Sequence, residues 1–227
     1  MKDEDKFLIH ENIKSGNTLI ASQLINENPQ LNLRADEDGR CPIHWAVSMN
    51  NFEMVKLLGS KGNLDIDELI DDSGWTAIHI ACSIGNEEML DYLMKLTPTP
   101  DVNLKTNQGV TPLHLAISKK NLGVIKKLII EYKCKCNVKD KNGYTPLQRA
   151  SSIGLLSIIT LLNEKGKVNL NSTDNYGWTA LHHALAEGKG DAAKLLIDLG
   201  ADKEVNSPDG LPIDVCVDEK IKKYVFQ

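Results

Sequence analysis

The sequence has few aromatic residues and no long apolar run. Aromatic side chains make up 5% of the 227 residues, so the core must be built mainly from Leu, Ile, Val and Ala. The longest apolar-looking stretch, 154–162, is far shorter than the roughly 20 residues of a membrane-spanning helix. The charged segment 1–6 leads into no signal-type apolar segment. We therefore expect no membrane partner.

A basic excess and a cysteine framework are also missing. The net charge is −5 at neutral pH, whereas nucleic-acid-binding proteins usually carry a basic excess, so we expect no nucleic-acid partner. The five cysteines are odd in number and lack the spacing of a disulfide framework. Reduced thiols of this kind are typical of the cytoplasm and the nucleus, which are the expected locations.

What the sequence does contain is a glycine that recurs at nearly constant spacing. Consecutive members are 35, 35, 34, 34 and 33 residues apart: Gly39, Gly74, Gly109, Gly143, Gly177 and Gly210. They open the related phrases GRCPIHWA, GWTAIHIA, GVTPLHLA, GYTPLQRA, GWTALHHA and GLPIDVCV. A period near 33 that carries T-P-L-H-x-A is the signature of ankyrin repeats. The repeat predicts an all-α ankyrin-repeat solenoid of about seven helix-turn-helix repeats with short β-turn fingers.

We expect these repeats to form one domain over residues 1–227. The predicted boundaries are an N-cap repeat at about 4–35, internal repeats at about 36–70, 71–105, 106–139, 140–173 and 174–206, and a C-cap repeat at about 207–227. Both terminal repeats carry polar substitutions, which such a stack needs to stay in solution. We expect the chain to be a monomer by itself.

The third copy shows how one repeat is expected to fold. Thr111 is placed to cap the first helix, because its hydroxyl can satisfy a free backbone N–H. Pro112 follows at the first helical position, where its missing N–H costs nothing. A second helix is predicted over about 122–132. On this reading Leu57 and Leu128 belong to the core.

No catalytic constellation, metal site or cofactor site is expected. Histidine recurs at one position of four repeats, about one repeat apart and too far for a shared ion: His44, His79, His114 and His182. Gln148 fills the same position in the fifth copy, which indicates a hydrogen-bonding role. Cys134 and Cys136 lack the matching pair that a zinc site needs. We therefore predict a protein that is not an enzyme.

Charge is distributed unevenly along the chain. Residues 36–101 include 13 acidic and 4 basic residues, and residues 105–149 include 10 basic and 2 acidic ones. Such blocks are equally compatible with an ordinary solvated face and with a binding surface. Several charges fall at the finger tips or after a first helix, where ankyrin stacks contact partners: Asp36, Asp38, Arg40, Asp71, Asp72, Lys119, Lys120 and Lys141.

Aromatic residues favour similar positions. Trp75, Tyr144 and Trp178 directly follow a repeat glycine. The variable position after the recurrent histidine holds Trp45, Arg149 and His183. Trp, Tyr and Arg are enriched at binding hot spots, so we predict that these residues contact a partner. The alternative is that each tryptophan packs on its neighbouring repeat.

Non-consensus residues in four segments, 36–45, 71–83, 106–110 and 184–193, resemble the gankyrin family and most closely its fungal members. The resemblance extends over essentially the whole chain. It implies a non-enzymatic chaperone for assembly of the proteasome 19S regulatory particle base, whose concave face binds the C-terminal domain of one AAA-ATPase subunit. Carried over by position, it implies an acidic contact at Asp36, Asp38, Arg40, Asp71 and Asp72, and a basic contact at Lys119 and Arg149.

Two other interpretations remain open from the sequence. One is an ankyrin-type inhibitor or adaptor of a cyclin-dependent kinase, a group that is broadly similar but usually shorter. The other is an enzyme or small-ligand protein that uses ankyrin repeats, which the absence of a catalytic phrase and of an added domain disfavours.

Overall fold

The computed structural model describes residues 8–61 and 64–227, and the regular elements of these residues are all helices. Within them there is no strand, only an isolated β-bridge between Ser207 and Gly210. The predicted all-α ankyrin fold is confirmed. The predicted start of the first repeat, near residue 4, lies outside the described residues.

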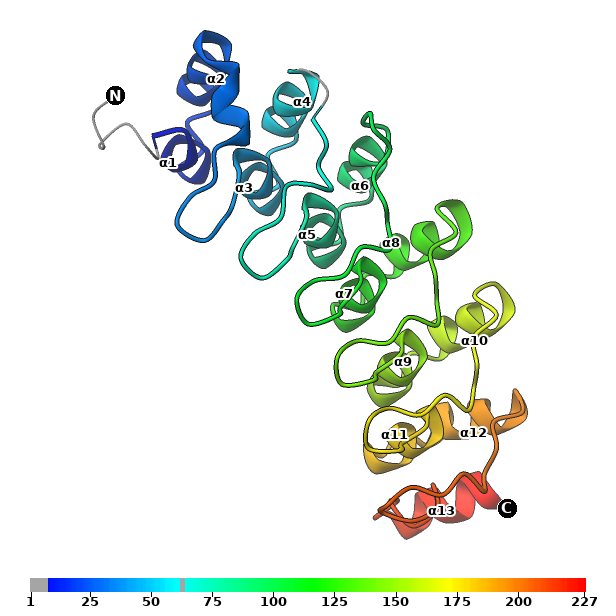
Figure 1. The fold of residues 1–227 in the computed structure, drawn as a ribbon. Coiled ribbons are helices and arrows are strands. Elements are labelled where there is room, and N and C mark those ends of the chain that lie inside the picture. The colour runs from blue at the N-terminus through cyan, green and yellow to red at the C-terminus, as the bar shows by residue number, and fades with distance from the viewer. Residues whose placement is uncertain (1–7, 62–63) are drawn as a thin grey trace. The chain divides into compact units, whose positions relative to one another are not determined.

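The chain divides into two compact units, which are described separately. Unit 1 is Met1–Asn107 and unit 2 is Gln108–Gln227. The helices of unit 1 are α1 (Leu8–Lys14), α2 (Thr18–Glu27), the 3-10 helix η2 (Pro29–Leu33), α3 (Pro42–Ser48), α4 (Phe52–Ser60), α5 (Ala77–Ile84) and α6 (Glu87–Leu93). Within this unit the first helices α1, α3 and α5 lie side by side, and α2, α4 and α6 form a second layer (Figure 1). The single-domain boundaries stay a prediction.

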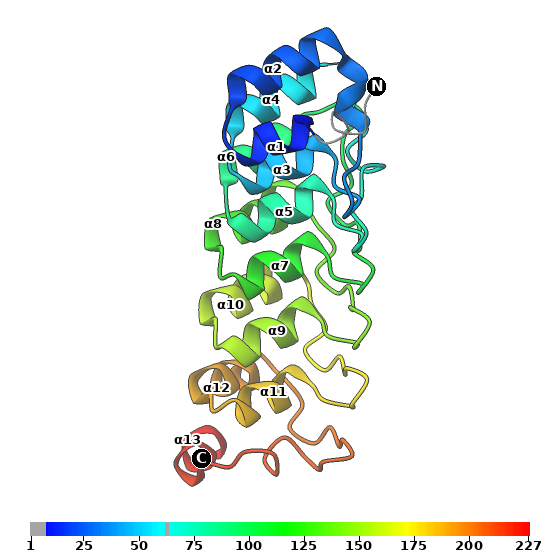
Figure 2. The same ribbon diagram turned by 90° about the vertical axis from the view of Figure 1, so that its left-hand side faces the viewer.

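Unit 2 repeats the same two-layer arrangement. Its helices are α7 (Pro112–Ser118), α8 (Leu122–Lys126), the π-helix η3 (Lys127–Glu131), α9 (Pro146–Ile153), α10 (Leu156–Glu164), α11 (Ala180–Ala186), α12 (Gly190–Asp198) and α13 (Glu219–Phe226). Figure 2 shows α7, α9 and α11 in one row. The second helix predicted over 122–132 is thus present, but its last turn is a π-helix.

A reciprocal cap starts the first helix of most repeats. In α7 the ring nitrogen Nδ1 of His114 accepts from the backbone N–H of Thr111 at 3.3 Å and lies 2.8 Å from the hydroxyl of Thr111. Because Nδ1 accepts, Nε2 carries the proton, and it donates to the backbone carbonyl of Tyr144 at 3.1 Å. The histidine therefore ties its own helix to the next finger, which is the hydrogen-bonding role predicted for it.

Gln148 performs the same two tasks in α9. Its Oε1 accepts from the backbone N–H of Thr145 at 2.7 Å, and its Nε2 donates to the carbonyls of Ser172 at 3.1 Å and Trp178 at 2.7 Å. An amide has an acceptor at one atom and a donor at the other, as a neutral imidazole does. This position therefore requires a neutral side chain that accepts a hydrogen bond at one atom and donates one at another.

The core of each unit consists of the inner faces of its helix pairs. Leu128 is fully buried, as predicted, and so are Val124 and Ile125 in α8. The placement of Leu57 in the core was wrong, because Leu57 is half-buried while its neighbour Leu58 is fully buried. One position along a helix rotates a side chain by about 100°, so an adjacent pair of leucines leaves the inward one undecided.

Neighbouring fingers within a unit are joined by backbone hydrogen bonds at their tips. The N–H of Asp72 donates to the carbonyl of Asp38 at 3.0 Å in unit 1, and that of Asn175 donates to Asn142 at 3.0 Å in unit 2. Gly39 has a positive φ of 75°, and a Cβ there would come within 2.5 Å of Asp72 Oδ1. The recurrent glycine is therefore required both by the turn and by the close approach of the next finger.

Candidate protein-binding surface

An aspartate holds the turn in four of the fingers. Its Oδ1 accepts from the backbone N–H groups two and four residues later; for Asp71 these are Ser73 and Trp75, each at 2.9 Å. The same pattern is present at Asp36, Asp140 and Asp174. One carboxylate oxygen is thus used to build the finger.

The second carboxylate oxygen meets a donor nine residues further along. Oδ2 of Asp36 accepts from Trp45 Nε1 at 2.7 Å, that of Asp140 from Arg149 Nη2 at 3.2 Å, and that of Asp174 from His183 Nε2 at 2.8 Å. These pairs give Trp45, Arg149 and His183 a structural role that the sequence analysis missed. The signal was present as an aspartate three residues before the repeat glycine and a polar residue nine positions after that aspartate.

Asp71 is the exception, because Ile80 occupies the position nine residues later. Its Oδ2 is instead 3.2 Å from Nε of Arg40, in the preceding finger. Asp71 is only 5% exposed. The structure therefore brings Arg40 and Asp71 together as an internal ion pair of unit 1, whereas Asp38 and Asp72 project from the finger tips as exposed carboxylates.

Trp45 lies at the centre of a charged cluster in unit 1. Lys14 Nζ is 3.9 Å and Arg40 Cζ is 5.0 Å from the centroid of its ring. Lys14 Nζ also lies 3.5 Å from Asp36 Oδ2, the acceptor of the indole N–H. Burial alone would raise the pKa of Asp36, but hydrogen bonds from the Trp45 indole and from the backbone outweigh it and lower that pKa. In this cluster the ammonium group of Lys14 contacts both the ring of Trp45 and the carboxylate of Asp36.

Trp75, the second aromatic residue of unit 1 predicted to contact a partner, is half-buried. Its ring centroid lies 6.2 Å from that of His79, at an interplanar angle of 47°. Part of the indole is therefore packed and part is accessible, so packing and partner contact are compatible for this side chain. Its contact with a partner stays a prediction.

The basic residues predicted in unit 2 lie at the finger tips and at the end of α7. Lys119, Lys120 and Lys141 are exposed. Arg149 donates from Nη1 to the Ser118 hydroxyl at 3.2 Å, which places it beside the end of α7. Arg149 thus lies in the same part of unit 2 as Lys119 and Lys120, and the contact of these residues with a partner stays a prediction.

Unit 2 also contains a pocket of about 240 Å³ between neighbouring fingers, which we call the Tyr144–Trp178 pocket. The ring of His183 lines it, with its centroid 5.0 Å from that of Tyr144 and 5.2 Å from that of Trp178. The indole N–H of Trp178 donates to Asp209 Oδ2 at 2.8 Å. The lining residues are Tyr144, Asp174, Tyr176, Trp178, His183, Glu187 and Asp209. Three predicted residues therefore meet here, together with four that the sequence analysis did not single out.

His183 is a neutral member of this pocket at physiological pH. Burial lowers its pKa and outweighs the carboxylate of Asp174, which acts in the opposite direction. Its Nε2–H donates to Asp174 Oδ2. The lining of the pocket includes no Lys or Arg side chain beside the carboxylate of Asp174.

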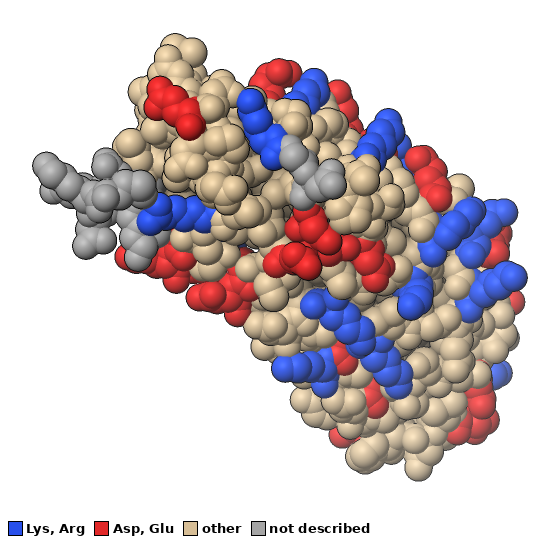
Figure 3. All heavy atoms as spheres, turned by 45° about the horizontal axis from the view of Figure 1, so that its top comes forward, with Lys and Arg blue, Asp and Glu red and all other residues tan. Residues whose placement is uncertain are grey.

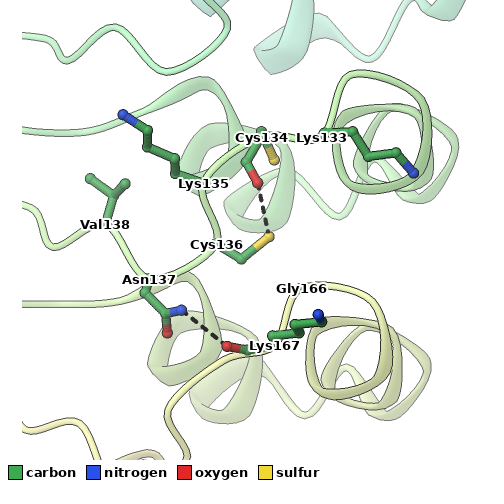
Figure 4. A pocket seen from close by; sticks show the side chains of 8 residues that line it. All are labelled: Lys133, Cys134, Lys135, Cys136, Asn137, Val138, Gly166 and Lys167. Atoms are coloured by element: carbon green, nitrogen blue, oxygen red, sulfur yellow. Dashed lines mark hydrogen bonds between the residues drawn. The ribbon is translucent and has the colours of Figure 1, made fainter.

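A second, more open pocket of unit 2 lies where η3 leads into the next finger. Lys133, Lys135 and Lys167 surround it, and Cys136 Sγ donates to the carbonyl of Cys134 at 3.4 Å (Figure 4). Figure 3 shows Lys and Arg side chains gathered on this side of unit 2. A hydrogen bond with the Cys134 side chain lowers the pKa of Cys136 despite its burial. The pocket adds three lysines to the basic residues of this unit.

Among the described residues, no group of three or more His, Cys, Asp or Glu side chains could hold a metal ion. None of the five cysteines, all within the described residues, forms a disulfide, and all are buried. In the described part of the chain no helix has both the length and the apolar character to span a membrane.

Comparison with known proteins identifies the repeat. The family profile "Ankyrin repeats (3 copies)" matches residues 1–68, 62–140 and 119–207. The ankyrin repeat domain of Bcl-3, a member of the IkappaB protein family, is structurally similar, with a TM-score of 0.80, 26% identity, and coverage of 96% of this chain and 97% of that chain. The probable 26S proteasome regulatory subunit p28 of Saccharomyces cerevisiae (strain ATCC 204508 / S288c) is 43% identical over 64 residues. That alignment covers 28% of each protein.

Proposed function

The chain belongs to the ankyrin-repeat family of protein-interaction scaffolds, and from that premise we propose that it is a non-enzymatic chaperone for assembly of the proteasome regulatory-particle base. In this proposal it binds the C-terminal domain of one AAA-ATPase subunit. The side that carries the fingers and the first helices forms the contact. We also propose that it acts as a monomer in the cytoplasm and the nucleus, with no cofactor.

The observation that carries the proposal is the 43% identical segment shared with a protein named as a probable proteasome regulatory subunit. The proposal takes from this similarity that the two proteins have a related partner as well as a related fold. The charge pattern supports it. Exposed carboxylates lie at finger tips of unit 1, and exposed ammonium groups lie at a finger tip and at the end of α7 in unit 2.

Titration of the full chain against the isolated C-terminal domain of each regulatory-particle ATPase tests the proposal. Isothermal calorimetry should detect binding to one of these domains, and the affinity should fall as salt is raised, because exposed charges are screened over about 8–10 Å. Affinity capture followed by mass spectrometry provides the second measurement. Recovery of a cyclin-dependent kinase without any proteasomal ATPase, or no binding to any of the domains, would overturn the proposal.

A further inference from the structure

We propose that the Tyr144–Trp178 pocket binds the side chain of an arginine that the protein partner supplies. The inference deepens the proposed function and rests on it in one respect, namely that a protein docks on the finger side of unit 2. The pocket would bind the planar guanidinium group through contacts with its aromatic rings and its carboxylates.

The lining of the pocket has the composition that such a cation requires. Tyr144 and Trp178 contribute aromatic faces, and a cation within about 6 Å of such a face is attracted by the ring quadrupole. Glu187 and Asp209 contribute carboxylates at the rim, where both side chains are exposed. Tyr176 is 63% exposed beside them. The volume of about 240 Å³ accommodates a side-chain head group and its methylenes, but not a helix.

Unit 1 provides an internal precedent for the missing cation. There the indole N–H of Trp45 donates to Asp36 Oδ2 at 2.7 Å, and Lys14 Nζ lies 3.5 Å from that oxygen and 3.9 Å from the ring centroid. In unit 2 the indole of Trp178 donates to Asp209 Oδ2 at 2.8 Å in the same manner. Within the described residues no Lys or Arg lines this second tryptophan–aspartate pair. The pair that the chain completes with its own cation in unit 1 is left open in unit 2.

The charge of the pocket is not balanced from within. Three carboxylates line it, those of Asp174, Glu187 and Asp209. His183 is the basic group among the lining residues, and it is held neutral by burial while it donates to Asp174. One buried and two exposed carboxylates beside aromatic walls favour a positively charged ligand, since the walls reduce the screening by water.

Arginine fits this site better than lysine does. A guanidinium group is planar, stacks on aromatic faces, and presents several N–H donors in one plane. The rings of Tyr144 and Trp178 both lie next to that of His183, with interplanar angles of 41° and 55° to it. A planar cation can stack on one ring while its edge reaches the carboxylates of Glu187 and Asp209. An ammonium group offers a point charge and cannot do both.

Three tryptophans allow the proposal to be tested on the full chain without the partner. The indole N–H signals of Trp45, Trp75 and Trp178 can be followed by NMR during titration with the peptide acetyl-Gly-Arg-Gly-amide. We expect saturable shifts of the Trp178 signal with millimolar affinity, and no saturable shift at Trp45, whose ring is already covered. The matching peptide with citrulline, a neutral isostere of arginine, should not bind, and the lysine peptide should bind more weakly.

Two variants and one control complete the test. Glu187→Gln should weaken binding of the arginine peptide about threefold, because it removes one exposed charge, and Tyr144→Leu about tenfold, because it removes an aromatic wall. Glu164→Gln, an exposed glutamate of α10 with the same change in net charge, should leave the affinity unchanged. Thermal melting by circular dichroism establishes that each variant is folded.

The outcomes separate this inference from the proposed function. Equal shifts with arginine and citrulline peptides, stronger binding of the lysine peptide, or equal affinities of the Glu187→Gln and Glu164→Gln variants would overturn the arginine assignment. None of these results depends on the ATPase domain. Conversely, a pocket that binds the arginine peptide in a chain that binds no ATPase domain would overturn the proposed partner and leave the pocket in place.

Discussion

The two units use the same pair of side chains in different ways. In unit 1 the tryptophan–aspartate pair of Trp45 and Asp36 is covered by Lys14 of the same unit. In unit 2 the pair of Trp178 and Asp209 lines a pocket without a cation among its described neighbours. The comparison shows that a residue type alone does not tell whether a tryptophan stabilises its own repeat or is available to a partner. The neighbouring charges decide that.

The units also differ in the charges of their finger tips. Asp38 and Asp72 are exposed at finger tips of unit 1, whereas in unit 2 Lys141 is exposed at a finger tip and Lys119 and Lys120 are exposed at the end of α7. A partner that contacts both must therefore present basic residues to the finger tips of the first unit and acidic residues to Lys119, Lys120 and Lys141 of the second. Charge complementarity of this kind mainly sets register, specificity and association rate.

The largest expected effect concerns the cores, in which the two units should behave alike. Leu58→Ala in unit 1 and Leu128→Ala in unit 2 should each lower the free energy of unfolding by about 2–5 kcal/mol, because both side chains are fully buried and each change leaves a cavity. Urea denaturation followed by circular dichroism measures this. Leu122→Ala is the control, since Leu122 is 42% exposed. A loss at only one of the two buried sites would show that the units differ in packing as well as in charge.

The next effect should distinguish the covered tryptophan from the open one. Trp45→Phe should lower the free energy of unfolding by about 1–2 kcal/mol, because it removes the donor to a largely buried carboxylate oxygen of Asp36. Trp178→Phe should cost less than about 1 kcal/mol, because Asp209 is exposed and water can replace the lost donor. The same denaturation experiment compares them. Equal losses would contradict the division into a structural and an available tryptophan.

Acid should destabilise the protein through the capping histidines. Burial lowers the pKa of His44, and it also lowers that of His182. The unfolded chain takes up a proton near pH 6.5 while the folded chain does not, so the unfolded state binds more protons below that pH. The stabilising contribution of these histidines is therefore complete above about pH 6.5. Below that pH, each of them lowers the free energy of unfolding by up to about 1.4 kcal/mol per pH unit.

Gln148 indicates how this pH dependence can be removed. His44→Gln places in unit 1 the amide that unit 2 already uses in α9, with the same acceptor and donor polarity. We expect the variant to fold and to lose less stability between pH 6.5 and 5.5 than the wild type does. Thermal melting across this range is the measurement. An unchanged dependence on pH would mean that another group is responsible.

The repeat architecture could be predicted from the sequence because its signals are local. Thr111, Pro112 and His114 lie within four residues, and the cap they form is determined by that short phrase. The glycine spacing likewise defines each finger. The inward leucine of α4 could not be chosen, because Leu57 and Leu58 are adjacent and both apolar. The π-helical last turn at η3 has no signature in the sequence.

The candidate site was harder to predict, because its contacts join distant parts of the chain. Tyr144, Trp178 and His183 were singled out separately by residue type, but Asp209 is 31 residues from Trp178 and belongs to the next finger. The pairing of Asp174 with His183 is periodic and could have been found by comparing positions nine residues apart in all repeats. The covering of Trp45 by Lys14 depends on two side-chain conformations, which the sequence does not specify.

The smallest expected effects are those of single exposed charges, and they test the difference in finger-tip charge between the units. Asp72→Lys in unit 1 and Lys141→Glu in unit 2 should each weaken binding to the ATPase domain about twofold to fivefold, because an exposed ion pair contributes only about 0.2–1 kcal/mol.

The controls for these reversals carry the same change in charge on exposed positions of the second helices. They are Glu88→Lys in α6 and Lys126→Glu in α8. Calorimetric titration at two salt concentrations should separate the sets, because the affinity gap between a tip variant and its control should shrink as salt screens the contact. If tip and control reversals weaken binding equally at both concentrations, then net charge alone governs the affinity. The finger tips then do not form the contact, and the opposite polarity of the two units has no part in choosing the partner.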